Sequence, residues 1–176
     1  MAYLGKYDSS LGLITLASDG ENLTGLWLEG QKYFAQTLEK GALQKDDLPV
    51  FSATKNWLDE YFKGKNPPIA NLPLAPKGGE FRQEVWGILC EIPYGKLLTY
   101  GDIAKMIASK RGKETMSSQA VGGAVGRNPI SIIIPCHRVV GSNGNLTGYA
   151  GGIDKKIKLL ELEGADTTKL FRRPNL

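Results

Sequence analysis

The chain has 176 residues, a mass of 19.1 kDa and a formal net charge of +4. This length is enough for one ordinary domain or two small ones. With 41% apolar and 23% charged residues it can bury a core, which excludes a disordered or collagen-like chain. Two cysteines and one histidine exclude a disulfide framework, and they cannot supply the roughly four ligands of a structural zinc site.

Basic residues gather in the second half of the chain. Residues 1–75 contain 7 Lys and Arg against 9 Asp and Glu, whereas residues 76–176 contain 15 against 9. This asymmetry indicates a polyanionic partner, although mild basicity alone is common among soluble domains. The first residues lack the apolar segment of a signal peptide, and no stretch approaches the ~20 apolar residues of a membrane span. We therefore expect a cytoplasmic protein with reduced thiols and no membrane partner.

The N-terminal part is predicted to be a β-meander followed by a helix. Short apolar or alternating runs separated by turn residues cover 1–7, 11–17 and 23–28. Aromatic and aliphatic residues then recur at near-helical spacing over 51–62, and Gly64 is a stop signal.

A stretch rich in proline and glycine covers residues 66–79 and is predicted to be an extended linker. We place a domain boundary within it. The chain then divides into an N-terminal β-rich supporting domain, 1–75, and a C-terminal domain, 76–176.

The second half is predicted to be mainly helical. Apolar residues follow a clean helical period over 80–92, and a second short helix follows Thr99 over 100–109. Ser117 and Ser118 are good N-cap residues for a third helix that runs to about Arg127. The order helix, connection, helix, strand is typical of a helix-turn-helix with a wing.

The remaining segments complete the predicted second domain. β-branched runs at 130–134 and 139–140 are predicted to be strands, and 142–145 has the composition of a hairpin turn. A last amphipathic helix covers 153–162, and 167–176 is predicted to be a loose basic tail in which Arg172 and Arg173 lie in solvent. The predicted fold class is α/β, of the α+β kind: a small N-terminal β-meander and helix lobe plus a C-terminal helical winged helix-turn-helix lobe.

The sequence Pro135-Cys136-His137-Arg138 carries the clearest chemistry. An apolar strand is predicted to deliver a thiol that is followed by the only histidine of the chain. Imidazole can take a thiol proton, and the charge of Arg138 would favour the thiolate. The alternative is a buried structural cysteine beside a surface histidine. A cysteine protease would draw its histidine from far away in the sequence, and adjacent side chains in a strand diverge, so we expect a bridging water between thiol and imidazole.

The segment 119–129 consists largely of Gly, Ala and Val, although each glycine costs ~1 kcal/mol relative to alanine in a helix. It lacks the row of Arg, Asn and Gln that reads the major groove of DNA. Small side chains would suit close approach to the minor groove, and equally they would suit tight packing against a neighbouring helix. Elsewhere, Cys90 and the three tryptophans, Trp27, Trp57 and Trp86, are predicted to be core residues.

Residues 79–164 resemble the methylated-DNA–protein-cysteine methyltransferases, also called 6-O-alkylguanine-DNA alkyltransferases. The resemblance rests on motifs in a fixed order and spacing: Phe81-Arg82-Gln83-Glu84-Val85-Trp86, Pro93-Tyr94-Gly95, Thr99-Tyr100, Ala120-Val121-Gly122-Gly123-Ala124, Arg127-Asn128-Pro129, Ile134-Pro135-Cys136-His137-Arg138-Val139, Gly148-Tyr149-Ala150-Gly151-Gly152 and Leu159-Leu160-Glu161-Leu162-Glu163-Gly164.

The resemblance implies a role for each matching residue. Cys136 would accept the alkyl group, His137 would deprotonate it through a water, and Glu163 would orient that histidine. Asn128 would belong to the same network. Tyr100 would line the pocket and help to extrude the nucleotide, because oxygen-6 of guanine is out of reach inside the base stack.

The resemblance also implies the contacts to substrate and DNA. Tyr149 and Ala150 would line the alkyl pocket, and Val139 would contact the guanine. The full set expected to contact substrate or DNA is Thr99, Gln119, Ala120, Gly122, Gly123, Arg127, Val139, Tyr149 and Ala150.

The sequence departs from the family pattern at Gln119, where many members insert an arginine into the stack. Glutamine lacks the guanidinium charge and stacking plane, so we expect weaker or differently balanced flipping. The loop 110–116 also looks longer than in some members, and its Lys110, Arg111 and Lys113 are candidate phosphate contacts. The metal site of some members has no matching residues here.

The predicted function is repair of 6-O-alkylguanine, with oxygen-4 of thymine as a possible further target. Transfer to Cys136 would be irreversible and single-turnover, without a cofactor, and a monomer would bind double-stranded DNA through its minor groove. Two alternatives stay open: a non-enzymatic sensor of the same damage, and a winged-helix regulator whose Cys136 is merely buried.

Overall fold

The structure is a computed structural model that describes residues 1–146 and 148–171. The chain forms two compact units. The first unit consists of Met1–Lys77 and the short segment Pro129–Ile133, and the second of Gly78–Asn128 and Ile134–Leu176. Arg172 and Arg173 of the predicted basic tail lie outside the described residues.

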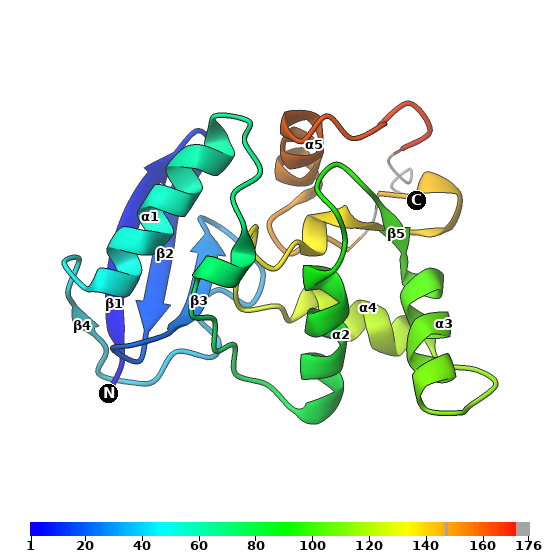
Figure 1. The fold of residues 1–176 in the computed structure, drawn as a ribbon, viewed down its shortest axis with the longest axis horizontal. Helices are drawn as coiled ribbons and strands as arrows, with labels where there is room; N and C mark the ends of the chain where they lie inside the picture. The colour runs from blue at the N-terminus through cyan, green and yellow to red at the C-terminus, as the bar shows by residue number, and fades with distance from the viewer. Residues whose placement is uncertain (147, 172–176) are drawn as a thin grey trace. The chain divides into compact units, whose positions relative to one another are not determined.

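The first unit is built on a four-stranded sheet with the order β3-β2-β1-β4 (Figure 1). Strands β1 (Tyr3–Ser9), β2 (Gly12–Ser18) and β3 (Leu23–Leu28) pair antiparallel, which confirms the predicted meander. Strand β4 (Leu43–Gln44) pairs parallel with β1. It was not predicted because a two-residue strand has no periodicity to detect.

Helix α1 (Pro49–Phe62) packs on this sheet, as the sequence predicts. Phe51 and Leu58 are fully buried, and a β-carbon on Gly5 of β1 would lie 2.9 Å from the Phe51 ring. Each such side chain contributes roughly 1.5–3 kcal/mol when it is buried. The linker that follows contains one short 3-10 helix, η1 (Ile69–Asn71).

The segment Pro129–Ile133 joins the first unit through β3. The backbone N–H of Leu26 donates to Pro129 O at 2.8 Å, and the N–H of Ser131 donates to Leu26 O at 3.0 Å. The predicted strand over 130–134 is wrong, because only Ile130 forms a bridge to β3. At Ile132 the backbone has φ 72° and turns the chain away.

The second unit contains the three predicted helices, α2 (Glu80–Cys90), α3 (Tyr100–Lys110) and α4 (Ser118–Gly126). Thr99 and Asp102 form a capping box at the start of α3. The indole N–H of Trp86 donates to Ala124 O at 2.9 Å, which ties α2 to α4. The predicted core positions of the three tryptophans are confirmed, whereas Cys90 is exposed, because it lies off the apolar face of α2.

The rest of the second unit surrounds the candidate site. Strand β5 (Leu98–Thr99) pairs parallel with β6 (Val139–Val140). The predicted turn over 142–145 is confirmed: within the short element η3 (Ser142–Gly144), Asn143 (φ 60°) and Gly144 (φ 87°) are left-handed, and the N–H of Asn145 donates to Ser142 O at 3.4 Å. After the turn, Asn145 bridges to Phe171. Helix α5 (Ile153–Leu162) is confirmed. Among the described residues, no helix is both long and apolar enough to cross a membrane.

Candidate active site

Two consecutive backbone turns present Cys136. Pro135 has φ −81° and ψ 66°, the values of an inverse γ-turn, and the N–H of Cys136 donates to Ile134 O at 2.8 Å. Cys136 then begins a short 3-10 helix, η2 (Cys136–Arg138), which leads into β6. The thiol therefore lies on a constrained turn, as the proline indicated, but no strand delivers it.

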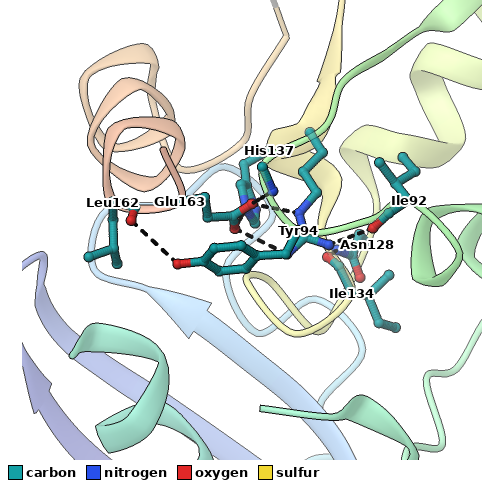
Figure 2. Close-up of polar contacts among 9 residues, drawn as sticks. Ile92, Tyr94, Asn128, Ile134, His137, Leu162 and Glu163 are labelled. Atoms are coloured by element: carbon teal, nitrogen blue, oxygen red, sulfur yellow. Dashed lines mark hydrogen bonds and ion pairs between the residues drawn. The ribbon is translucent and has the colours of Figure 1, made fainter. Parts of the chain in front are cut away.

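Glu163, at the C-cap of α5, gathers the polar groups of the site (Figure 2). Its Oε2 lies 2.5 Å from Nε2 of His137, and its Oε1 accepts from Nε of Arg138 at 2.8 Å and from the N–H of Gly95 at 3.1 Å. The second guanidinium contact, Arg138 Nη2 to Oε2, is 3.2 Å. Glu163 and His137 are buried, and Arg138 is nearly so, so this network is shielded from water.

The network favours a neutral histidine. Burial lowers the pKa of His137, and the nearby charges of Arg138 and Lys156 act in the same direction, although Glu163 opposes them. A neutral ring that shares its Nε2 proton with Glu163 has its lone pair on Nδ1. His137 can therefore act as a base on that side.

Cys136 is buried, with 4% of its surface exposed, and burial raises its pKa. A hydrogen bond from the Asn128 side chain, the charge of Lys156 and the N–H groups of Cys136 and His137 act in the opposite direction. The resting thiol is therefore protonated near neutral pH, and the surroundings are arranged to accept it as a thiolate once a base removes the proton.

The predicted effect of Arg138 on the thiol is wrong. Arg138 is engaged with Glu163, and its Nη1 donates to Ile92 O at 2.6 Å. The cation that lowers the pKa of Cys136 is Lys156, which the sequence analysis missed. Two positive side chains stand near the site, and spacing along the chain could not tell which of them faces the sulfur.

Lys156 is a fully buried lysine on α5. Its Nζ donates to Val139 O at 2.5 Å and lies 6.0 Å from the ring centroid of Tyr149. Burial lowers its pKa to about 8, and Cys136 acts in the opposite direction. A signal was present in the sequence, since position 156 falls one turn after Ile153 on the apolar stripe of the helix.

Asn128 ties the end of α4 to the turn that precedes Cys136. Its N–H donates to Val125 O at 3.2 Å, and its Nδ2 donates to Ile134 O at 2.8 Å (Figure 2). The predicted membership of Asn128 in the cysteine network thus has a geometric basis. The network positions both the backbone before the thiol and the thiol itself.

A hollow of about 420 Å³ lies beside α3 and α4. Its wall includes three of the predicted contact residues, Thr99, Gln119 and Gly122, together with Tyr100, Gly101, Ser118, Ser142 and Gly148. Tyr100 also lies close enough to Cys136 that the sulfur helps to raise the tyrosine pKa to about 12, after burial. Tyr100 therefore both lines the hollow and lies near the thiol, which is not itself part of the wall.

The other predicted contact residues differ in exposure. Ala120 and Gly123 are exposed on α4, Arg127 is its C-cap residue, and Val139 is fully buried in β6. Tyr149 is 9% exposed, and no described residue forms a hydrogen bond with its buried hydroxyl. Ala150, next to it, is half-buried in a turn.

In the part of the chain that the structure describes, no three His, Cys, Asp or Glu side chains form a metal-binding cluster.

Comparison with known proteins identifies the family. The model of the 6-O-methylguanine DNA methyltransferase DNA-binding domain matches residues 80–165, and that of the ribonuclease-like domain of the same proteins matches residues 2–76. The chain belongs to this family. The family is the one that the motifs resemble, and the predicted α+β fold is confirmed.

Relatives in this methyltransferase family resemble the chain along most of its length. The methylated-DNA–protein-cysteine methyltransferase of Haemophilus influenzae is 42% identical over 92% of this chain and 86% of its own. That of Methanosarcina acetivorans is 43% identical over 93% and 99%. The crystal structure of Mycobacterium tuberculosis OGT in complex with DNA matches with a TM-score of 0.79 and 38% identity, covering 96% of this chain and 94% of that one.

Proposed function

We propose that this protein repairs double-stranded DNA by moving the alkyl group of 6-O-alkylguanine onto its own Cys136. The relatives are named for transfer from methylated DNA to a protein cysteine, and the M. tuberculosis structure contains DNA. The observation that carries the proposal here is the buried cluster of Cys136, His137 and Glu163, in which a thiol, a neutral imidazole and a carboxylate lie in one water-poor site.

The proposed reaction is a single displacement. His137 receives the thiol proton through a water, and Sγ attacks the alkyl carbon. The bond from that carbon to oxygen-6 breaks as the bond to sulfur forms, and the electron pair passes to the guanine ring. The ring takes a proton at N1, so guanine is restored and the sulfur carries the alkyl group. The cysteine thiolate is a poor leaving group from the thioether that forms, so the protein acts once and needs no cofactor.

Flipping of the nucleotide would bring the base to the sulfur. The hollow beside α3 and α4 lies next to Tyr100, and the base would pass this side chain on its way to Cys136. The buried hydroxyl of Tyr149 is a donor that a bound base can satisfy, because no described residue does. Val139 and Ala150 are proposed to complete the pocket.

Helix α4 is proposed to approach the minor groove. A β-carbon on Gly123 would meet nothing within 4 Å, so packing inside the protein does not require this glycine. Gln119 lies in the wall of the hollow, where it would fill the gap that the flipped base leaves, and Arg127 would contact the backbone. Arg111 pairs with Glu84 at 2.6 Å, which leaves Lys110 and Lys113 as the loop's main phosphate contacts.

Peptide mass spectrometry after incubation with duplex DNA containing 6-O-methylguanine tests the proposal. We expect a methyl group on Cys136 and none on Cys90, with unmodified duplex as the control. Tight binding to the lesion without methylation would support a damage sensor instead. Equal binding to both duplexes, again without methylation, would support a winged-helix regulator.

The division into domains 1–75 and 76–176, the monomeric state and the cytoplasmic location stay predictions.

A further inference from the structure

A buried polar pair in the first unit joins Gln31, which is far along the chain from the candidate site, to Ser131, which lies shortly before Cys136 in the sequence. The hydroxyl of Ser131 donates to Oε1 of Gln31 at 3.1 Å, and the two residues are only 2% and 5% exposed. The same Oε1 accepts from the N–H of Leu28 at 3.0 Å, and the N–H of Gln31 donates to Leu28 O at 3.1 Å. Gln31 is thus fixed at the end of β3 and presents one oxygen to Ser131.

Ser131 immediately precedes a strained residue. Ile132 has φ 72°, and the N–H of Ile133 donates to Ser131 O at 2.8 Å, which closes a γ-turn of the rare positive-φ form. A β-branched side chain is disfavoured in this region and persists only where neighbouring contacts impose it. The imposing contacts here are the bonds of Ser131, one from its backbone to Leu26 and one from its side chain to Gln31.

The strained turn leads directly into the residues that present the thiol. Ile134 follows it, and Ile134 O accepts from both the N–H of Cys136 and Nδ2 of Asn128. A relaxation of Ile132 to negative φ would change the direction in which the chain leads to Ile134, whose carbonyl oxygen accepts both bonds. The chain therefore passes directly from a turn within the first unit into the bonds that present the sulfur.

We propose that Gln31 is a positioning residue for alkyl transfer: its bond to Ser131 maintains the left-handed turn at Ile132 and so fixes Cys136 in the reactive position. The inference rests on the proposed function, because it assumes that Cys136 is the acceptor. It assigns to the first unit a specific contribution to the chemistry.

Single-turnover kinetics of Gln31→Leu and Ser131→Ala test the inference. The rate of methyl transfer is measured against the concentration of duplex DNA with 6-O-methylguanine, from pH 6 to 9. Since reaction rates are sensitive to small displacements of the reacting atom, we expect a limiting rate roughly tenfold lower and a half-saturating DNA concentration within about twofold of wild type. The loss should be the same factor at every pH, because the pair is uncharged and lies outside the titrating network.

Matched variants separate positioning from simple loss of stability. Gln44→Leu makes the same change on the exposed strand β4 and should transfer at the wild-type rate. The double variant Gln31→Leu/Ser131→Ala should be no slower than the slower single variant, since each single change already removes the bond between the two side chains. If Gln31→Leu fails to fold, as seen by its near-ultraviolet circular dichroism, Ser131→Ala decides alone.

The outcomes distinguish this inference from the proposed function. Wild-type limiting rates in folded variants, with only the melting temperature lowered, would overturn the role of Gln31. A wild-type protein that transfers no methyl group would instead overturn the proposed function itself.

Discussion

Glu163 is the residue on which the polar network converges. It accepts hydrogen bonds from His137, Arg138 and Gly95. Its negative charge is shared among these donors, and it does not raise the pKa of His137 enough to keep the imidazole protonated. Gly95 has φ 74°, and a β-carbon there would lie 2.9 Å from Glu163 O, which explains a glycine at this point of the Pro93-Tyr94-Gly95 motif.

The lowered pKa of His137 predicts a specific dependence of stability on pH. Below the ordinary histidine pKa of 6.5 the unfolded chain binds a proton that the folded protein does not, so stability falls as pH falls from 6.5 toward the folded pKa. The loss approaches about 1.4 kcal/mol per pH unit in that window. His137 is the only histidine, so urea unfolding of His137→Asn between pH 5.5 and 7 should show a flatter profile. Equal slopes for both proteins would contradict the buried neutral imidazole.

Lys156 is expected to stabilise the thiolate of Cys136 while it carries its charge. Because its pKa is lowered to about 8, this effect is complete below that pH and fades as pH rises through it. Lys156→Met should raise the apparent pKa of transfer and slow the reaction at pH 7 by roughly tenfold, which corresponds to a shift of about one pKa unit. The rate–pH profile is the measurement, and Lys158→Met, exposed on the same helix, is the control. A slower reaction with an unshifted profile would show that Lys156 matters only for packing.

At the scale of elements, the long periodic segments could be predicted and the short turns could not. Helices α1, α2, α3 and α5 and the three-strand meander follow from apolar spacing and caps such as Thr99. The run of isoleucines before Cys136 has strong β propensity, yet tertiary contacts force a γ-turn at Ile132. The site residues that are neighbours in the sequence could be recognised from the sequence. The roles of Lys156 and Gln31 could not, because they depend on which faces of the elements pack together in the fold.

Helix α4 gives a prediction about DNA affinity. Gly123 is exposed and open, so Gly123→Leu should leave stability unchanged or raise it by up to ~1 kcal/mol, since glycine is a poor helix former. The added side chain should nevertheless weaken binding to duplex DNA by at least about tenfold, because it prevents close approach to the groove. Fluorescence anisotropy measures the affinity, and Gly87→Leu on the exposed face of α2 is the matched control. Unchanged affinity in Gly123→Leu would remove α4 from the interface.

At the scale of the whole molecule, the sequence of the second unit carries the chemistry and the first unit contributes the segment that leads into it. Residues 129–133 belong with the first unit although they are enclosed in the sequence of the second. A prediction that divides the chain at a single linker could not reveal that this later segment belongs with the first unit. The contact of Ser131 with Gln31 spans 100 positions, which no local pattern can detect.

Alkylation should destabilise the spent protein. Cys136 is only 4% exposed, so a methyl group on sulfur overfills a packed site and removes the hydrogen bonds that favour the thiolate, at a cost of roughly 1–3 kcal/mol. For a chain of this length the melting temperature should fall by several degrees. Calorimetry before and after reaction with lesion DNA measures the change, with Cys136→Ala taken through the same treatment. An unchanged melting temperature in fully methylated protein would contradict close packing around the sulfur.

The stoichiometry of the reaction tests the central claim most directly. Protein is titrated against an excess of duplex DNA whose 6-O-methylguanine carries an isotopic label in the methyl group, and the label bound to protein is counted. Transfer to a single sulfur predicts that label stops at one methyl group per chain, that Cys136→Ala binds none and that Cys90→Ala binds the wild-type amount. Continued turnover beyond one methyl group per chain, or full labelling of Cys136→Ala, would contradict the account.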